Sequence, residues 1–298
     1  MDPAPLLAPE LVARIAALEV AARIAAEGAL AGMHRSPRRG SSVEFAEHKE
    51  YAPGDELRHV DWKTYGRSDR LYVKRFEEET ELHALFVVDA SESMRYGEGD
   101  HDKLRFASLL AAALAYLLLT RRDRAGLVLT GGEAVPVGAR PGHLRRLLAA
   151  LAATEPRGAA SLADALRRAD ALAHRRTQVI VLSDLLDPDL DEVLAAARSL
   201  KARGHDPVLV QVLHADERTL PFDETAWFES RDPDVRVFAD AREVRAAYLE
   251  ELAALVARCE TAAAAARIPF AALETSIDPA IAVARLLRGP LAPAARAA

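Results

Sequence analysis

Residues 85–93 read LFVVDASES, four apolar residues followed at once by an acid and a serine-rich turn. A short unbroken apolar run is typical of a strand buried on both faces in a parallel sheet. The same pattern recurs at 178–184, QVIVLSD, where a second apolar run ends at Asp184. Because ligands collect at the carboxyl ends of the strands in open α/β sheets, we expect Asp89 and Asp184 to mark a functional edge.

Strand and helix patterns alternate regularly around these two runs, which predicts an α/β fold. We expect an open, mostly parallel twisted sheet with helices on both faces, preceded by an N-terminal helix and a loop-rich segment with short strands. A thin apolar stripe within residues 8–31 predicts the N-terminal helix, packed on the same molecule or, alternatively, on a partner. The remaining strands are expected at 125–130, 207–213 and 270–273, and the remaining helices at 104–119, 143–153, 161–173, 189–203, 241–267 and 279–287.

The segment from His34 to Arg75 differs in composition from the rest of the chain. It holds ten Lys or Arg and seven Asp or Glu between residues 31 and 75, and it mixes aromatic with charged residues. Leu71–Val73 is a candidate short strand. The basic cluster of Arg35, Arg38 and Arg39 indicates a solvated loop or, alternatively, a site for an anionic groove. Residues 55–67 suit internal packing or a protein interface. We therefore predict a region 1–80, a main domain 81–288 and a flexible tail 289–298.

The composition excludes several classes of protein. A net charge of −6 gives no reason to expect nucleic-acid binding, and the single cysteine, Cys259, excludes an intramolecular disulfide. The N-terminus lacks the pattern of a signal peptide. The longest nearly apolar run, 106–119, has 14 residues, whereas a membrane span needs roughly 20. These features predict a cytoplasmic protein without a membrane span.

The D-x-S-x-S spacing of Asp89, Ser91 and Ser93 allows a carboxylate and two hydroxyls to converge on one point. Such oxygen ligands suit Mg²⁺, and also Mn²⁺ or Ca²⁺. Three oxygens do not fill an octahedron, so water and a group from outside must complete the shell. The alternative is that these residues only cap a helix or form a turn.

Residues 81–275 resemble a von Willebrand factor A domain, in which D-x-S-x-S forms the first loop of a metal-ion-dependent adhesion site. The resemblance makes Asp184 the aspartate of the third loop. The stretch RSPRRGSSVEFAEHKEYAPGDELRHVDWKTYGRSDRLYVKRFEEE resembles the signature of the domain-of-unknown-function 58 family. The second loop of that family carries a threonine where this chain has Ala160, so its ligand is either the neighbouring Ser161 or water, and the resemblance then implies weak metal binding.

The resemblance implies a non-enzymatic interaction module that works with a MoxR-type AAA+ ATPase in the assembly, maturation or remodelling of a client protein. An acidic side chain of the partner would complete the metal site. One alternative is a metal-dependent phosphohydrolase with Asp89 as nucleophile, although Ser91 stands where such enzymes carry a second aspartate, and no lysine is evident beside the site. Another is a scaffold whose metal site has decayed.

Overall fold

The computed structural model describes residues 8–34, 48–50, 65, 72–74, 81–156, 158, 161–174, 176–186, 189–230 and 235–292. The chain forms two compact units, residues 36–81 and the rest. In the first of these, β1 (His48–Glu50) pairs antiparallel with β2 (Tyr72–Lys74), where a strand was expected. The predictions for Arg35, Arg38, Arg39 and, apart from Tyr65, residues 55–67 lie outside the described residues.

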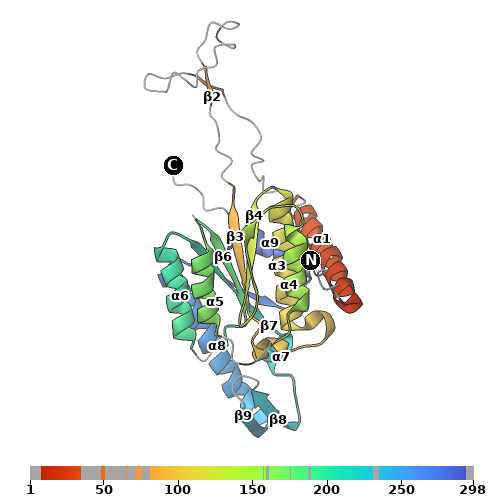
Figure 1. Cartoon of the computed structure of the whole chain (residues 1–298). Helices are drawn as coiled ribbons and strands as arrows, with labels where there is room; N and C mark the ends of the chain where they lie inside the picture. The colour runs from red at the N-terminus through yellow and green to blue at the C-terminus, as the bar shows by residue number, and fades with distance from the viewer. Residues whose placement is uncertain are drawn as a thin grey trace. The chain divides into compact units, whose positions relative to one another are not determined.

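The main unit is built on a six-stranded sheet with the order β10-β7-β6-β3-β4-β5 (Figure 1). All neighbouring strands pair in parallel except β4 and β5. This confirms the predicted open, mostly parallel α/β sheet. Chain order reverses between β3 and β6, which makes the crevice at their carboxyl ends the expected ligand position. The strands are β3 (His83–Val88), β4 (Arg124–Leu129), β5 (Ala134–Gly138), β6 (Gln178–Ser183), β7 (Asp206–Leu213) and β10 (Phe270–Glu274).

Helices cover both faces of the sheet, as predicted (Figure 1). Side chains of β3 alternate between the two sides, so that Phe86 and Val88 enter one hydrophobic core while Leu85 and Val87 enter the other. The first core is covered by α1 (Pro9–His34), α3 (Lys103–Thr120), α4 (His143–Ala153) and α9 (Pro279–Arg288). The second is covered by α5 (Leu162–Leu172), α6 (Leu190–Ala202) and α8 (Ala241–Ala265).

The N-terminal helix α1 belongs to the same compact unit as the sheet. Its stripe of Ile15, Ala22 and Ala25 is buried in the first core. The helix approaches α9 closely, since a Cβ atom added to Gly28 would lie 2.9 Å from the Cβ atom of Ala280. Small residues on α1 thus permit tight helix packing on the body of the molecule.

Helix α3 is the one helix of the described residues that is long and apolar enough to cross a membrane, with a mean hydropathy of 1.5. Two thirds of its residues are buried inside the protein. A helix that forms the core of a domain can have the same length and composition, so this feature alone does not indicate a membrane span. Asp102 caps its first turn by accepting a hydrogen bond of 2.7 Å from the amide of Arg105.

Four elements of the main unit were not predicted from the sequence. Strand β5 lies at the edge of the sheet and pairs antiparallel with β4. Helix α7 (Ala215–Thr219) follows β7 and is about one and a half turns long. β8 (Thr225–Ser230) and β9 (Val235–Asp240) form an antiparallel hairpin outside the main sheet. The cross-strand pair Trp227 and Phe238 remains 63% and 59% exposed on this hairpin.

Candidate functional site

Asp89 stands at the carboxyl end of β3, next to β6. Its backbone amide donates a hydrogen bond of 2.9 Å to the carbonyl of Leu182, which extends the pairing of β3 with β6 by one residue. The chain then turns, and the amide of Ser91 donates to Asp89 Oδ1 at 2.9 Å. A 3₁₀ turn, η2 (Glu92–Arg95), follows. The buried carboxylate therefore lies at the switch point of the sheet.

Two hydroxyls on the flanking strand ends hold this carboxylate. Thr130 Oγ1 donates to Asp89 Oδ1 at 3.2 Å and accepts from the amide of Ala90 at 2.6 Å. On the other side, Ser183 Oγ donates to Asp89 Oδ2 at 2.6 Å. Sequence reasoning missed both residues. The signal was available, because Thr130 follows β4 and Ser183 ends β6, the two strands that flank β3.

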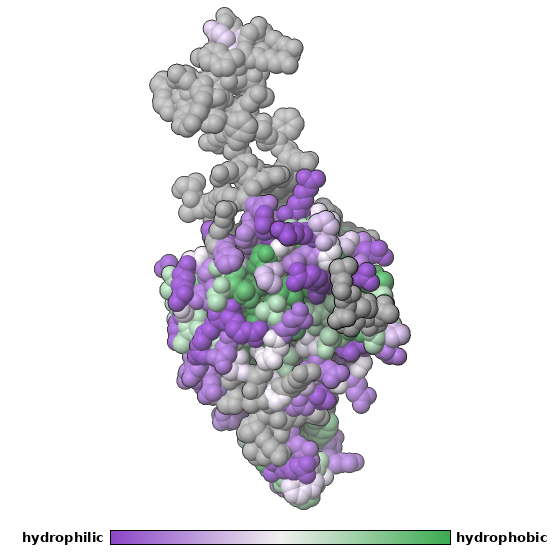
Figure 2. Space-filling model, in the orientation of Figure 1, coloured by the Kyte–Doolittle hydropathy of each residue, from purple (hydrophilic) through white to green (hydrophobic). Residues whose placement is uncertain are grey.

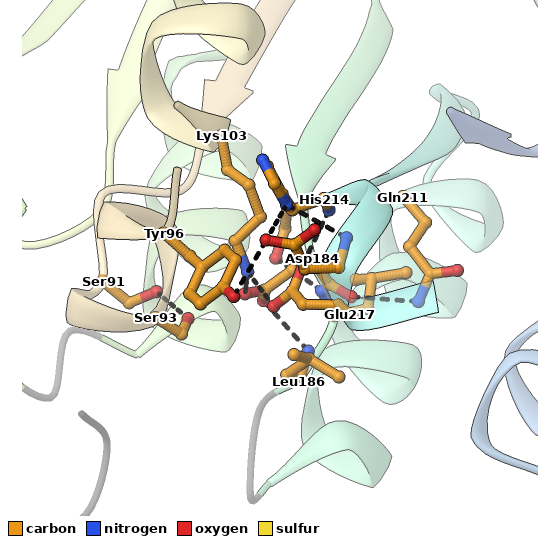
Figure 3. A network of polar contacts seen from close by, with 12 residues as sticks. Ser91, Ser93, Tyr96, Lys103, Asp184, Leu186, Gln211, His214 and Glu217 are labelled. Atoms are coloured by element: carbon orange, nitrogen blue, oxygen red, sulfur yellow. Dashed lines mark hydrogen bonds and ion pairs between the residues drawn. The ribbon is translucent and has the colours of Figure 1, made fainter. Parts of the chain in front are cut away.

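The hydroxyls of Ser91 and Ser93 meet at the edge of the site, with their Oγ atoms 3.0 Å apart (Figure 3). Adjacent ligands of an octahedral Mg²⁺ ion, each about 2.1 Å from the metal, are also about 3.0 Å apart. The two hydroxyls therefore lie within hydrogen-bonding distance of each other, and their convergence with Asp89 on one metal ion stays a prediction. The donor set is one of hard oxygens, of the kind that Mg²⁺ prefers.

Asp89 is a buried carboxyl group whose pKa departs from its usual value. Burial, and secondarily the negative charge of Asp184, raise the pKa of Asp89 from 3.8 to about 6, against the hydrogen bonds from Ser183 and Ser91. The group is therefore mostly ionised at pH 7 while only 4% exposed. Within the described part of the chain, no Lys, Arg or His forms an ion pair with it. A cation at this position would relieve the cost of burying the charge.

Asp184, by contrast, already has a cation. Its Oδ2 atom lies 2.8 Å from Lys103 Nζ, and its Oδ1 atom accepts from the amide of Leu186 at 3.1 Å. Lys103 Nζ also lies 2.6 Å from Oε1 of Glu217 on α7, so that one ammonium group joins α3, the end of β6 and α7 (Figure 3). We call these three residues the lysine triad. The role predicted for Asp184 in metal binding stays a prediction.

Within the lysine triad, the side chains of Lys103 and Asp184 are buried, at 0% and 2% exposure, whereas that of Glu217 is 13% exposed. Burial alone would lower the pKa of Lys103, but the carboxylates of Asp184 and Glu217 outweigh it and raise that pKa. The ring of Tyr96 covers the ammonium group, with Nζ 6.0 Å from the ring centroid. Sequence reasoning missed this lysine because it belongs to the first turn of a helix that is otherwise apolar.

Ser161 acts as the N-cap of α5, since its Oγ atom accepts from the amide of Asp164 at 3.2 Å. The structure therefore shows Ser161 in the role predicted as the alternative, that of a helix cap. Ala160 lies outside the described residues. No group of three His, Cys, Asp or Glu side chains suited to a metal occurs in the part of the chain that the structure describes. A metal at Asp89 would depend on hydroxyls, with a single direct carboxylate from this chain.

Comparison with known proteins places this site in a family context. The profile of the family described as "Protein of unknown function DUF58" matches residues 47–257. An uncharacterized protein of Mycobacterium tuberculosis is 30% identical over 223 residues, which cover 72% of this chain and 68% of the mycobacterial protein. The family match at 47–257 covers most of the segment rich in aromatic and charged residues and most of the sheet domain.

Two solved structures are similar over 70% of this chain, each with a TM-score of 0.47. One is described as the conserved hypothetical protein BatB from Bacteroides thetaiotaomicron, with 14% identity and 97% of its chain covered. The other is an aerotolerance-related membrane protein from Bacteroides fragilis, with 15% identity and 98% covered. The membrane description of the latter contradicts the cytoplasmic location predicted here. The prediction was wrong because the lack of a signal-peptide pattern does not identify the compartment of a protein.

Proposed function

The chain belongs to the DUF58 family, and from that premise we propose that it is a non-enzymatic protein-interaction module with a metal-ion-dependent adhesion-type site. In this proposal the edge of the sheet at Asp89 presents a divalent cation to an acidic side chain of another protein. The observation that carries it is the pair of hydroxyls, Ser91 and Ser93, set 3.0 Å apart beside a buried carboxylate that lacks a partner cation among the described residues.

Asp89, Ser91 and Ser93 would hold the ion directly or through water. Thr130 and Ser183 would fix the orientation of the Asp89 carboxylate, because their hydroxyls already donate to its two oxygens. When bound, the cation supplies positive charge for an incoming carboxylate. Mg²⁺ is the ion we propose, with Mn²⁺ and Ca²⁺ as the other hard cations that suit oxygen ligands.

The affinity for the ion should be modest. One carboxylate and two neutral hydroxyls neutralise only part of a divalent charge, and Asp184 is already paired with Lys103. An acidic group of the partner would add the missing negative charge and fill a coordination position. Metal and partner would then bind cooperatively, each increasing the affinity for the other.

The partners we propose are a MoxR-type AAA+ ATPase and a client protein that the pair assembles, matures or remodels. The support is the resemblance of the chain to the DUF58 family. The matched region, 47–257, includes residues of both compact units. A direct test uses the purified companion ATPase from the same organism. We expect surface plasmon resonance to show binding in Mg²⁺ that falls at least tenfold in EDTA and in Asp89→Asn. Equal binding under all three conditions would exclude docking through the ion.

The ion itself is tested by thermal unfolding of the full chain with and without Mg²⁺. At a hundred times its dissociation constant, a ligand stabilises the folded state by about 2.7 kcal/mol, or about 8 °C for a domain of this size. We expect this shift in the wild type, and we expect it to vanish in Asp89→Asn and in the double variant Ser91→Ala/Ser93→Ala. Ser199→Ala, an exposed serine on α6, is the matched control and should keep the full shift.

A metal-dependent phosphohydrolase is the second candidate, because Asp89 lies at the carboxyl end of β3, where an aspartate nucleophile would stand. The structure brings a lysine, Lys103, to this edge. The lysine is fully buried and held by two carboxylates, so it offers no free donor to a phosphate group. A screen of phosphoesters with Mg²⁺ separates the two functions. Turnover that disappears in Asp89→Asn would replace the interaction module with the enzyme.

A further inference from the structure

A second candidate site lies at the opposite edge of the sheet from Asp89. A cavity of about 450 Å³ opens where β4 begins, β5 ends and α4 starts. Because β3 and β4 are parallel and in register, with Arg124 beside His83, the start of β4 lies about 20 Å along the strands from the level of Asp89. The cavity is lined by Arg124, Pro136, Val137, Gly138, Ala139, Arg140, Pro141, His143 and Arg146.

The cavity is strongly basic in an acidic protein. Three of its lining residues are arginines, and the stretch 121–146 holds six arginines against two acids, while the whole chain carries a charge of −6. Arg140 and Arg146 are both exposed. In the described ranges, no carboxylate forms an ion pair with either of them. Their guanidinium groups are thus available to an anion from solution.

His143 packs against the strand ends that line the cavity. The ring of His143 is 7% exposed, and its Nε2 atom donates a hydrogen bond of 2.8 Å to the carbonyl of Ala125 on β4. Gly138 allows the ring to lie there, because an added Cβ atom would come within 3.0 Å of His143 Cε1. The hydrogen bond and the close packing hold the His143 ring against the strand ends at this cavity.

Size and lining together indicate the class of ligand. Pockets for small molecules span roughly 300–1,000 Å³ and combine apolar walls with a few polar groups. Arginine matches phosphate geometry because its donors form a planar fork. Pro136, Val137 and Pro141 add an apolar wall beside the guanidinium groups, more surface than a bare phosphate ion can cover. Figure 2 shows hydrophilic residues along this end of the sheet domain, beside a hydrophobic patch between α4 and α5.

We propose that this cavity, the arginine pocket, binds a small organic phosphate. The phosphate group lies against Arg140 and Arg146, and the organic part lies against the wall of Pro136, Val137 and Pro141. The arginine pocket is separate from the proposed metal site at Asp89. Ligand binding in this pocket does not depend on the function proposed above.

The test is isothermal titration calorimetry of the full chain in EDTA, so that the metal site makes no contribution. The probes are ADP, adenosine and inorganic phosphate. We expect ADP to bind most tightly, inorganic phosphate at least tenfold more weakly, and adenosine not at all at millimolar concentration. Raising the ionic strength should weaken ADP binding, because the arginines are exposed to screening ions.

Variants connect the binding to the pocket. Arg140→Gln and Arg146→Gln should each weaken ADP binding about tenfold, which is 1.4 kcal/mol. Arg198→Gln makes the same change of charge on an exposed face of α6 and should leave the affinity unaltered. Absence of ADP binding, or equal losses in all three variants, would overturn the proposal. Inorganic phosphate binding as tightly as ADP would also overturn it, by removing the role of the apolar wall.

Discussion

The lysine triad makes the strongest quantitative prediction. Replacing Lys103 with methionine keeps the length of the side chain but removes the ammonium group that lies 2.8 Å from the carboxylate of Asp184 and 2.6 Å from that of Glu217. Removing one partner of a buried ion pair costs about 4 kcal/mol, because the remaining charge is left uncompensated. For a domain of this size, that loss lowers the melting temperature by about 12 °C.

Circular dichroism at pH 7, followed during heating, measures this effect. Lys201→Met is the matched control, since Lys201 is partly exposed and its pair with Asp206 at 3.0 Å should contribute less than about 1 kcal/mol. Neutralising the acids as well, in Lys103→Met/Asp184→Asn/Glu217→Gln, should recover at least half of the loss. A melting temperature of Lys103→Met close to that of the control, or no recovery in the triple variant, would refute the buried triad.

Three further predictions concern single residues. Because the pKa of Asp89 is raised to about 6, Asp89→Asn should gain stability relative to the metal-free wild type as the pH rises from about 4 to 7, by about 3 kcal/mol in urea titrations. A constant difference would contradict the burial of that charge. Ser161→Ala should cost about 1 kcal/mol, as loss of a helix cap does, and leave any shift caused by Mg²⁺ intact; loss of the shift would make Ser161 a ligand. The Cys259 thiol is fully buried, so a thiol reagent should label it only after unfolding, and rapid labelling of the native protein would disprove this.

The sheet was predictable because its signal is local and strong. Runs such as 85–88 and 178–183 are apolar without interruption, as strands covered on both faces must be. The hairpin β8–β9 and the edge strand β5 were missed for the opposite reason. Pro136 and Gly138 interrupt the pattern of β5, and Trp227 and Phe238 stay exposed on the hairpin instead of entering a core.

The candidate site was predictable only in part. The spacing of Asp89, Ser91 and Ser93 brings their side chains together through a single turn, so sequence suffices there. Lys103 and Glu217 are 114 residues apart, and only the fold brings them into contact. Thr130 lies between these cases, since knowing that β4 lies beside β3 places it level with Asp89.

The hairpin has a practical consequence for spectroscopy. The chain contains two tryptophans, Trp62 in the unit 36–81 and Trp227 on the hairpin of the main unit. Each compact unit therefore contains one tryptophan, which can be excited selectively over the tyrosines. In Trp62→Phe, the emission spectrum and its quenching by acrylamide report on the hairpin by itself, and in Trp227→Phe they report on the other unit. Events in the two parts of the protein can thus be followed separately in unlabelled samples.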